Sequence, residues 1–593
     1  MVSVLILVVC VYLAWKVAPR ERDEHAHVHG AGQVGLLAAV ALFGVDYFTS
    51  YFYATGELMS ALHPYGLDHY GYIAVAVIAA ANLAFGVLYI VSLGAFNEGG
   101  GSFTASMRYL GPSLSLIVAV VLIQDYVLTI VVSTLSGVDQ LLSVTNSYGI
   151  HWFWHFGLGA ALAMTTWYIT IRGRGESAQV VGTLLGVFVL LTVTLAVGLF
   201  VALAKQVPPV PQAVPVGEVS LGEALRHLLT ASMKGMVALS GLEAMSNGIQ
   251  FVKDEDAGLV AWGKVHLPRL RRVWQFYSGK SGIGRVVQTS FLFYGGLTTL
   301  FLTSFAIHFN VFDGTLGRTL VGNLAFIGFG QMPGGVVLYW AYQLLAVAML
   351  TAASMTAFQD LQAITWRNVA IGEVPEVVVY RNPKGTFTRP VTAAVIAAIV
   401  IQLAVRGRTS VAVPFYGVGV FLPLTAMALA MRQHFKTASS GRARRYGLAF
   451  STAVTVLGAL VFVGQIAGKW EEGGWVVLIS LSVLILLAHA SLISPMGARD
   501  PRQIFRIVRE KARVQGAMGS IVEWQSLKMQ EYRYQVLQVL RRTFEVFGLR
   551  RPDPVEPVPA GDYDHAVHSD QPEAPSILLP HLEAPASPGR RGV

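Results

Sequence analysis

The chain has 593 residues, of which 54% are hydrophobic and only 13% are charged, a composition far from that of a soluble globular domain. The net charge of +9 does not indicate nucleic-acid binding, because the basic residues are spread over loops between apolar segments and over the C-terminal region. Cys10 is the single cysteine, which excludes a disulfide framework and a thiolate metal site.

The N-terminal 32 residues combine a short apolar segment, Val2 to Trp15, with a polar linker. The segment resembles either a membrane helix or a signal sequence, and we expect a retained helix because no small-residue cleavage site follows it. His25, His27 and His29 alternate in the linker like a metal-binding tract. Three histidines before a helix are more often incidental, so we predict no metal site in this linker.

Residues 33–495 contain a series of apolar segments, each long enough to cross a bilayer core of about 30 Å. They lie near residues 33–61, 70–95, 113–140, 152–171, 177–204, 222–250, 286–308, 334–365, 390–405, 410–431, 447–467 and 474–494. The sequence therefore predicts an all-α polytopic membrane protein with twelve core transmembrane helices and one extra N-terminal helix.

Basic residues predict the orientation of this core. If residue 33 starts on the cytoplasmic side, the basic residues of 253–285, 367–389 and 432–445 all fall in cytoplasmic loops, and the outer loops hold far fewer. The positive-inside rule then places both ends of the core in the cytoplasm of a cell-membrane protein. Residues 253–285 also interleave apolar side chains, as a helix lying in the headgroup layer does.

The region after residue 495 differs in composition from the core. Residues 496–550 form a basic amphipathic stretch, which we expect on the cytoplasmic side. Residues 551–593 are rich in proline, acidic residues and histidine without apolar periodicity, so we predict a disordered tail.

Two acidic residues stand within apolar segments, where an ionisable side chain costs roughly 2.5 to 3.5 kcal/mol and usually marks a binding site or pathway. Asp46 lies in the first segment, and Tyr53 follows seven residues later, on the same helical face. Asp125 lies in the third segment, with Thr129 and Ser133 at steps of four residues. This spacing predicts a stripe of oxygen atoms along one face.

Glu243 is the third such acid, in the sixth segment, where glycine and small polar residues cluster over residues 238–248. This pattern is typical of a transport helix that is broken to expose backbone carbonyls and amides. Interruptions in the first and sixth segments predict a five-plus-five inverted repeat.

The acids favour a cation as the transported species. A dehydrated alkali cation needs carboxylate, hydroxyl, phenol and carbonyl oxygens, whereas the carboxylate of an amino-acid substrate would be repelled by Asp46. One carboxyl could carry a proton and couple transport to the proton gradient, and Glu243 is our candidate. Two plainer interpretations stay open: membrane hydroxyls often bond their own helix backbone, and Tyr53 could be an interface anchor.

Four motifs carry a resemblance to a known family. They are Gly99-Gly100-Gly101-Ser102-Phe103, Asp125-Tyr126 with Thr129 and Ser133, Ser240-Gly241-Leu242-Glu243-Ala244, and Pro414-Phe415-Tyr416-Gly417-Val418-Gly419-Val420-Phe421. Together they resemble the KUP-type potassium transporters of the amino acid-polyamine-organocation (APC) superfamily, over roughly residues 33–495. The resemblance implies a LeuT-like fold with the inverted repeat inferred above, potassium–proton symport, and a homodimer.

The resemblance also implies a set of site residues. The potassium-binding residues would be Asp46, Tyr53, Asp125, Tyr126, Thr129, Ser133, Ser240 and Tyr416, and the proton-coupling residue Glu243. Ser240 stands where the family has threonine, which keeps the hydroxyl. The glycine-small-glycine pattern with which permeases hold an amino acid in the first helix is missing.

We therefore predict a secondary transporter that imports potassium across the plasma membrane, with the ion near mid-membrane between the first, third and sixth helices. The alternative is a permease for an amino acid or a cationic amine, which the same fold serves. An enzyme is not indicated, no cofactor is expected, and a receptor or scaffold would not need three buried acids.

Overall fold

The computed structural model describes residues 2–17, 34–211, 219–370, 376–379, 382–470 and 474–493. The chain divides into a unit Met1–Arg533 and a unit Tyr534–Val593. The second unit, the predicted amphipathic stretch and tail, and the histidines of the N-terminal linker all lie outside the described residues. Within the described ranges the chain is helical apart from its connections, with an isolated bridge between Val34 and Val252.

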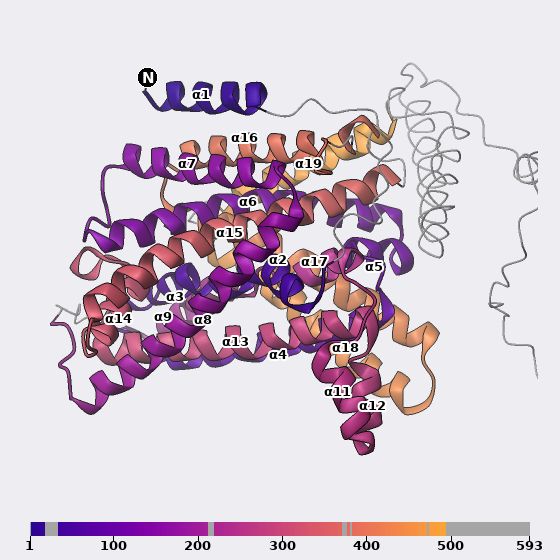
Figure 1. The fold of residues 1–593 in the computed structure, drawn as a ribbon, viewed down its shortest axis with the longest axis horizontal. Coiled ribbons are helices and arrows are strands. Elements are labelled where there is room, and N and C mark those ends of the chain that lie inside the picture. The colour runs from indigo at the N-terminus through magenta and orange to yellow at the C-terminus, as the bar shows by residue number, and fades with distance from the viewer. Residues whose placement is uncertain are drawn as a thin grey trace, which may run out of the picture. The chain divides into compact units, whose positions relative to one another are not determined.

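The first half of the chain forms the helices α1 to α8 (Figure 1), which match the predicted segments except for α5. They are α1 (Val2–Val17), α2 (Leu36–Thr49), α3 (Tyr51–Ser60), α4 (Gly71–Ala95), α5 (Gly101–Tyr109), α6 (Pro112–Val144), α7 (Trp152–Ile171) and α8 (Arg174–Ala204).

The second half contains one segmented helix, several short helices and six long ones. They are α9 (Leu221–Gly235), the 3-10 turn η3 (Met236–Leu239), α10 (Ala244–Gly248), α11 (Gly258–His266), α12 (Arg271–Phe276), α13 (Gly279–Phe309), α14 (Leu320–Phe329), α15 (Gly335–Ala370), α16 (Thr388–Ala404), α17 (Thr409–Ala438), α18 (Gly441–Gly468) and α19 (Trp475–Ile493).

A helix thus covers every predicted core segment. Among the described residues, eight helical stretches are long and apolar enough to cross a membrane. They are Leu36–Tyr65, Asp68–Ala95, Pro112–Val144, Val181–Ala204, Gly279–Phe309, Gly335–Val369, Thr409–Ala438 and Gly441–Gly468. The predicted fold class, an all-helical chain that crosses the membrane several times, is confirmed.

The structure differs from the prediction in the connections. The short helices α5 and α14 were not predicted, because each is too brief for an apolar period to show. The surface helix expected over residues 253–285 is a pair of helices, α11 and α12, which separate at Pro268 since proline cannot continue a helix. Apolar side chains on this pair are exposed, including Trp262 and Val265, as a helix in the headgroup layer requires.

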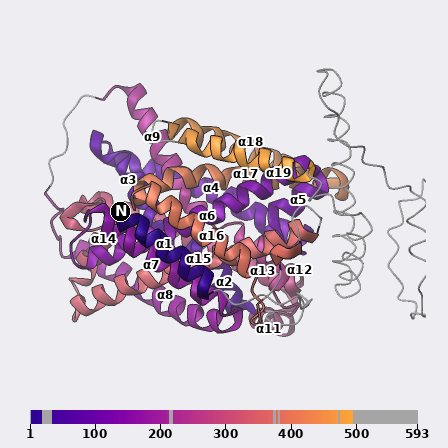
Figure 2. The same ribbon diagram turned by 90° about the horizontal axis from the view of Figure 1, so that it is seen from above.

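The helix α6 is central to the packing. It lies against α15, α17, α7 and α16, while α15 also packs on α2, and α13 runs along α4 (Figure 1). Figure 2 shows α17, α18 and α19 grouped along one edge. The short α10 contacts both α2 and α15, so the broken segment lies among α2, α6, α15 and α17. This arrangement brings residues from the first, third, sixth and tenth predicted segments to one interior.

Candidate functional site

The predicted sixth segment is broken, as its glycines indicated. The helix α9 ends at Gly235, η3 follows, and the chain leaves the helical conformation at Ser240, whose ψ is 149°. Gly241 has a φ of +80°, and a Cβ there would lie 3.0 Å from both Asp46 Oδ2 and Tyr47 N. Glycine is therefore required at this position for two reasons: the backbone conformation and the close approach of α2.

The first core segment bends rather than breaks. Ser50 separates α2 from α3, yet its φ of −60° and ψ of −25° are helical, and the Ala54 amide still donates to the Ser50 carbonyl at 3.0 Å. The Ser50 and Thr49 hydroxyls donate to carbonyls three or four residues earlier, a bonding pattern that bends helices. Asp46 and Tyr53 therefore keep nearly helical spacing on either side of the bend.

Three hydroxyls connect this bend to the break in the sixth segment. Tyr53 donates to Ser50 Oγ at 2.9 Å, Ser50 Oγ lies 2.9 Å from Ser240 Oγ, and the Tyr53 hydroxyl lies 3.2 Å from Ser240 Oγ. All three side chains are buried. They form a compact group of hydroxyl oxygens in which each can turn a lone pair toward a cation.

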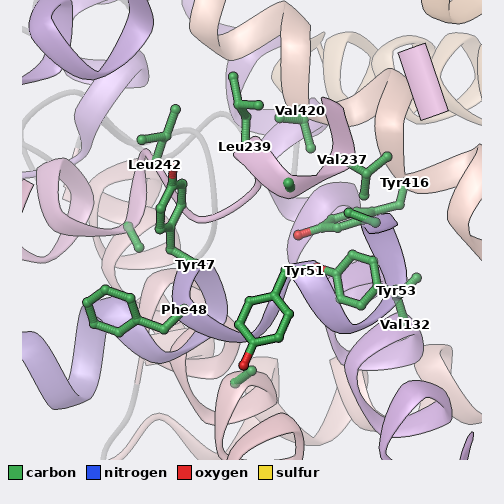
Figure 3. Packing of buried hydrophobic residues seen from close by; sticks show 14 of the residues in the cluster. Tyr47, Phe48, Tyr51, Tyr53, Val132, Val237, Leu239, Leu242, Tyr416 and Val420 are labelled. Atoms are coloured by element: carbon green, nitrogen blue, oxygen red, sulfur yellow. The ribbon is translucent and has the colours of Figure 1, made fainter. Parts of the chain in front are cut away.

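A second pair of hydroxyls extends the group toward α6 and α17. Thr129 Oγ1 donates to the Tyr416 hydroxyl at 2.9 Å and also contacts the Asp125 carbonyl at 2.9 Å. The Tyr416 and Tyr53 rings lie 6.5 Å apart between centroids, and Figure 3 shows them beside Val237 of η3. Hydroxyls from the first, third, sixth and tenth predicted segments therefore gather at one place.

Two carboxylates adjoin these hydroxyls with oxygen atoms that no described residue satisfies. Asp46 is 4% exposed, and its Oδ1 has no hydrogen-bond partner; the same holds for the buried Oδ1 of Asp125 and for Ser133 Oγ. Asp125 lies against Gly419 of α17, where an added Cβ would be 3.1 Å from Oδ1. The two carboxylates are close enough to repel each other electrostatically. A buried polar atom without a partner needs an explanation, and a bound cation would provide one for both carboxylates.

Tyr126 and Glu243 belong to a neighbouring polar group. Tyr126 accepts a hydrogen bond from Asn247 Nδ2 at 2.7 Å. Glu243 Oε1 accepts from the Ser102 amide at 2.7 Å and from the Ser102 hydroxyl, at the N-terminus of α5. A carboxylate in this position complements the positive end of the helix. The hydrogen bonds of these two predicted site residues therefore go to Asn247 and Ser102 rather than to the hydroxyls around Ser240.

Sequence reasoning missed Asp360 on α15. Its side chain is 3% exposed, its Oδ1 has no partner among the described residues, and it lies within electrostatic range of Asp46, Asp125 and Glu243. The cost argument that identified Asp46 applies equally to this acid within an apolar segment, and would have found it.

Chelation of a transition metal is not supported by the part of the chain that the structure describes. No group of three or more His, Cys, Asp or Glu side chains there is arranged to hold a metal ion. The site instead combines two carboxylates with several neutral hydroxyls. Such a set of hard oxygen ligands suits a monovalent alkali cation.

Two comparisons with known proteins each find a similarity between this chain and membrane transporters. The profile of the amino acid permease family matches residues 34–263. The potassium transporter KimA of Bacillus subtilis (strain 168) is 26% identical over 409 residues, which cover 68% of this chain and 61% of KimA. The resemblance to KUP-type transporters of the APC superfamily is confirmed.

The range that matches the permease profile contains much of the site. Asp46, Asp125, Ser240 and Glu243 lie within residues 34–263, whereas Tyr416 lies beyond them. The break in the sixth segment and the bend in the first both fall in the matched part. The chain spans about three fifths of the length of KimA, the relative that it matches.

Proposed function

We propose that this chain imports potassium across the plasma membrane by symport with protons. The similarity to KimA, a potassium transporter, supports potassium as the substrate. The distribution of basic residues supports a multi-pass orientation in which both ends of the transporter core are cytoplasmic. The lipid bilayer, potassium and protons are then the partners, and the resemblance to dimeric transporters adds a second copy of the chain.

The proposal depends on two carboxylate oxygens, one on Asp46 and one on Asp125, that have no hydrogen-bond partner and adjoin a cluster of buried hydroxyls. Each buried charge costs roughly 2.5 to 3.5 kcal/mol, and two that repel each other cost more. A potassium ion between them offsets that cost, while the hydroxyls replace its hydration shell. The proposed ligands are drawn from Asp46, Tyr53, Asp125, Tyr126, Thr129, Ser133, Ser240 and Tyr416.

Glu243 is the proposed proton-coupling residue. Its carboxylate lies at the break of the sixth segment, bonded to Ser102 of α5, and its charge acts on Asp125. Protonation would remove the charge that holds Ser102 and also the repulsion on Asp125. A proton at Glu243 can therefore change both the helix contact and the affinity of the site for a cation.

The proposed architecture is the LeuT-like five-plus-five inverted repeat with twelve core helices. The bend between α2 and α3 and the break between α9 and α10 occur in the first and sixth predicted segments, the equivalent positions of two five-helix repeats. The N-terminal α1 is then an additional helix outside the repeats.

A permease for an amino acid or a cationic amine is the second candidate, and the match to the amino acid permease profile favours it. An amino acid would bring a carboxylate to a site that already holds Asp46 and Asp125. Because like charges at close range repel, this structure favours a substrate without a carboxylate.

Uptake into liposomes tests the proposal. Purified protein should take up rubidium, a potassium surrogate, in a saturable manner that an acidic exterior accelerates and that amino acids do not inhibit. Saturable uptake of labelled amino acids without rubidium uptake would select the permease instead. Rubidium uptake whose rate does not depend on the pH gradient would show that the protein is a uniporter and not a proton symporter.

A further inference from the structure

A second group of acids lies away from the site described above. A cavity of about 220 Å³ is lined by side chains from α3, α6, the connection between α13 and α14, and the start of α17. Its lining includes Tyr53, Glu57, Ser136, Asp139, Asp313 and Thr409. The cavity lies along the C-terminal part of α6, which the positive-inside rule assigns to the outer side of the membrane.

The three carboxylates of this cavity outnumber the basic groups that contact them. Glu57 Oε2 is 3.8 Å from Lys234 Nζ, and Asp139 pairs with His155 Nε2 at 2.9 Å. Asp139 also accepts from Thr409 Oγ1 at 2.5 Å. The cavity therefore has three acidic side chains, and the basic side chains that contact them are one lysine and one histidine.

One carboxylate oxygen of Asp313 accepts a hydrogen bond from the protein backbone. Its Oδ1 accepts from the Leu320 amide at 2.6 Å, at the start of α14. Its Oδ2 lies against Gly56, where a Cβ would be only 1.9 Å away. The carboxylate is therefore held at the wall of the cavity by α14 and by the absence of a side chain on α3.

Ser136 provides an independent sign that a ligand belongs here. Its side chain is 2% exposed and lines the cavity, and its Oγ has no hydrogen-bond partner. Ser136 also continues the oxygen stripe of α6. Asp125, Thr129, Ser133, Ser136 and Asp139 follow one another at steps of three or four residues, which places them along one face of this helix.

We propose that this cavity is an outer site for an alkali cation that keeps part of its hydration shell, and that the ion passes from it to Asp125 along α6. The proposal rests on the proposed function, since it takes the transported species to be a cation. A chelated divalent ion is disfavoured because the described carboxylates do not converge into a metal-binding group.

Tyr53 contacts both the outer cavity and the central site. Its side chain lines the outer cavity, while its hydroxyl bonds to Ser50 and Ser240 at the central site. On the proposed route, an ion that moves from the outer cavity to Asp125 passes Tyr53 and either displaces its hydroxyl from these partners or uses it as a ligand. Clefts lined by one sign of charge raise the local concentration of counter-ions and their rate of association by about tenfold or more.

Uptake kinetics test the outer site. At low ionic strength, Glu57→Gln and Asp313→Asn should each raise the KM for rubidium about tenfold and leave kcat within about twofold, because the lost charge acts on association. Glu223→Gln is the matched control: it neutralises an exposed acid at the start of α9 whose capping bond glutamine retains. An unchanged KM in both cavity variants would overturn the proposal.

Direct observation of the ion covers the case in which these variants fail to reach the membrane. A structure of the full-length protein with thallium, a heavy potassium surrogate, should show density beside Ser136 and Asp139, and the Asp125→Asn variant should keep it. Absence of that density at a concentration that fills the central site would overturn the proposal.

The two proposals fail in different ways. If wild type transports rubidium but shows no thallium in the outer cavity, the outer site alone is wrong. If wild type holds thallium in the outer cavity but takes up no rubidium, the proposed transport function is wrong and the binding site stands.

Discussion

The central acids and Glu243 were predicted by the same argument, yet the structure places them in different surroundings. Asp46 and Asp125 each keep a buried carboxylate oxygen without a hydrogen-bond partner. Glu243 has its Oε1 committed to the backbone and the side chain of Ser102. The cost of burial therefore locates acids that need a partner, but the partner differs: we propose a cation for the first two, whereas the third contacts a helix N-terminus.

This contrast assigns separate tasks to the two regions. The uncommitted oxygens of Asp46 and Asp125 are available to a cation, whereas Glu243 joins the broken segment to α5 and would release it on protonation. Four variants test the division, in order of decreasing effect on uptake.

Asp125→Asn should have the largest effect. The amide keeps the shape of the side chain but removes the charge that offsets the lost hydration of the ion, so rubidium uptake should fall by about 100-fold or more at unchanged protein level. Asp254→Asn, at an exposed loop aspartate, is the matched control and should transport normally. Normal uptake by Asp125→Asn would remove this residue from the site.

Thr129→Val should weaken binding without abolishing transport. It removes the hydroxyl that contacts Tyr416 but keeps the branched shape, so the KM for rubidium should rise about tenfold, in the range of one ordinary hydrogen bond. Thr129→Ser restores the hydroxyl and should restore the KM. If valine and serine behave alike, Thr129 acts through packing alone.

Gly241→Ala should lower stability and, through Asp46, uptake by a few-fold. Alanine at a φ of +80° costs about 1 to 2 kcal/mol, and its Cβ would press on Asp46 Oδ2. Thermal unfolding in detergent measures the loss. Gly222→Ala is the matched control, because nothing lies within 4 Å of its added Cβ, and it should unfold like the wild type.

Glu243→Gln should have the smallest effect on uptake when the pH is equal on both sides. Glutamine can still accept from Ser102 but cannot exchange a proton, so the acceleration by an acidic exterior should disappear. Initial rates with and without an imposed pH gradient measure this. A variant that still responds to the gradient would show that Glu243 is a helix cap without a role in coupling.

Much of the fold was predictable because membrane helices are set by local composition. The segments near residues 113–140 and 152–171 match α6 and α7 within a few residues, since apolar length alone defines them. The helices α5 and α14 could not be found in this way because they are short. Pro268 divides α11 from α12, a signal that was present in the sequence but was outweighed by the surrounding apolar pattern.

Candidate site residues could be chosen from the sequence one by one, but their grouping could not. Acids in apolar segments indicated Asp46 and Asp125, and the spacing of four residues indicated Thr129 and Ser133 as candidates. That Ser240 bonds Tyr53, while Tyr126 turns to Asn247, depends on how separate helices pack. Contacts of this kind are set by tertiary structure, which no single segment encodes.

The position of a bound ion tests the central claim most directly. In a structure of the wild-type protein with thallium, we predict density within coordination distance of both Asp46 and Asp125, beside the hydroxyls of Thr129 and Tyr416. The same density should be lost in Asp125→Asn. A thallium-soaked wild-type protein with no density between these two carboxylates, or with both facing lipid, would contradict the account.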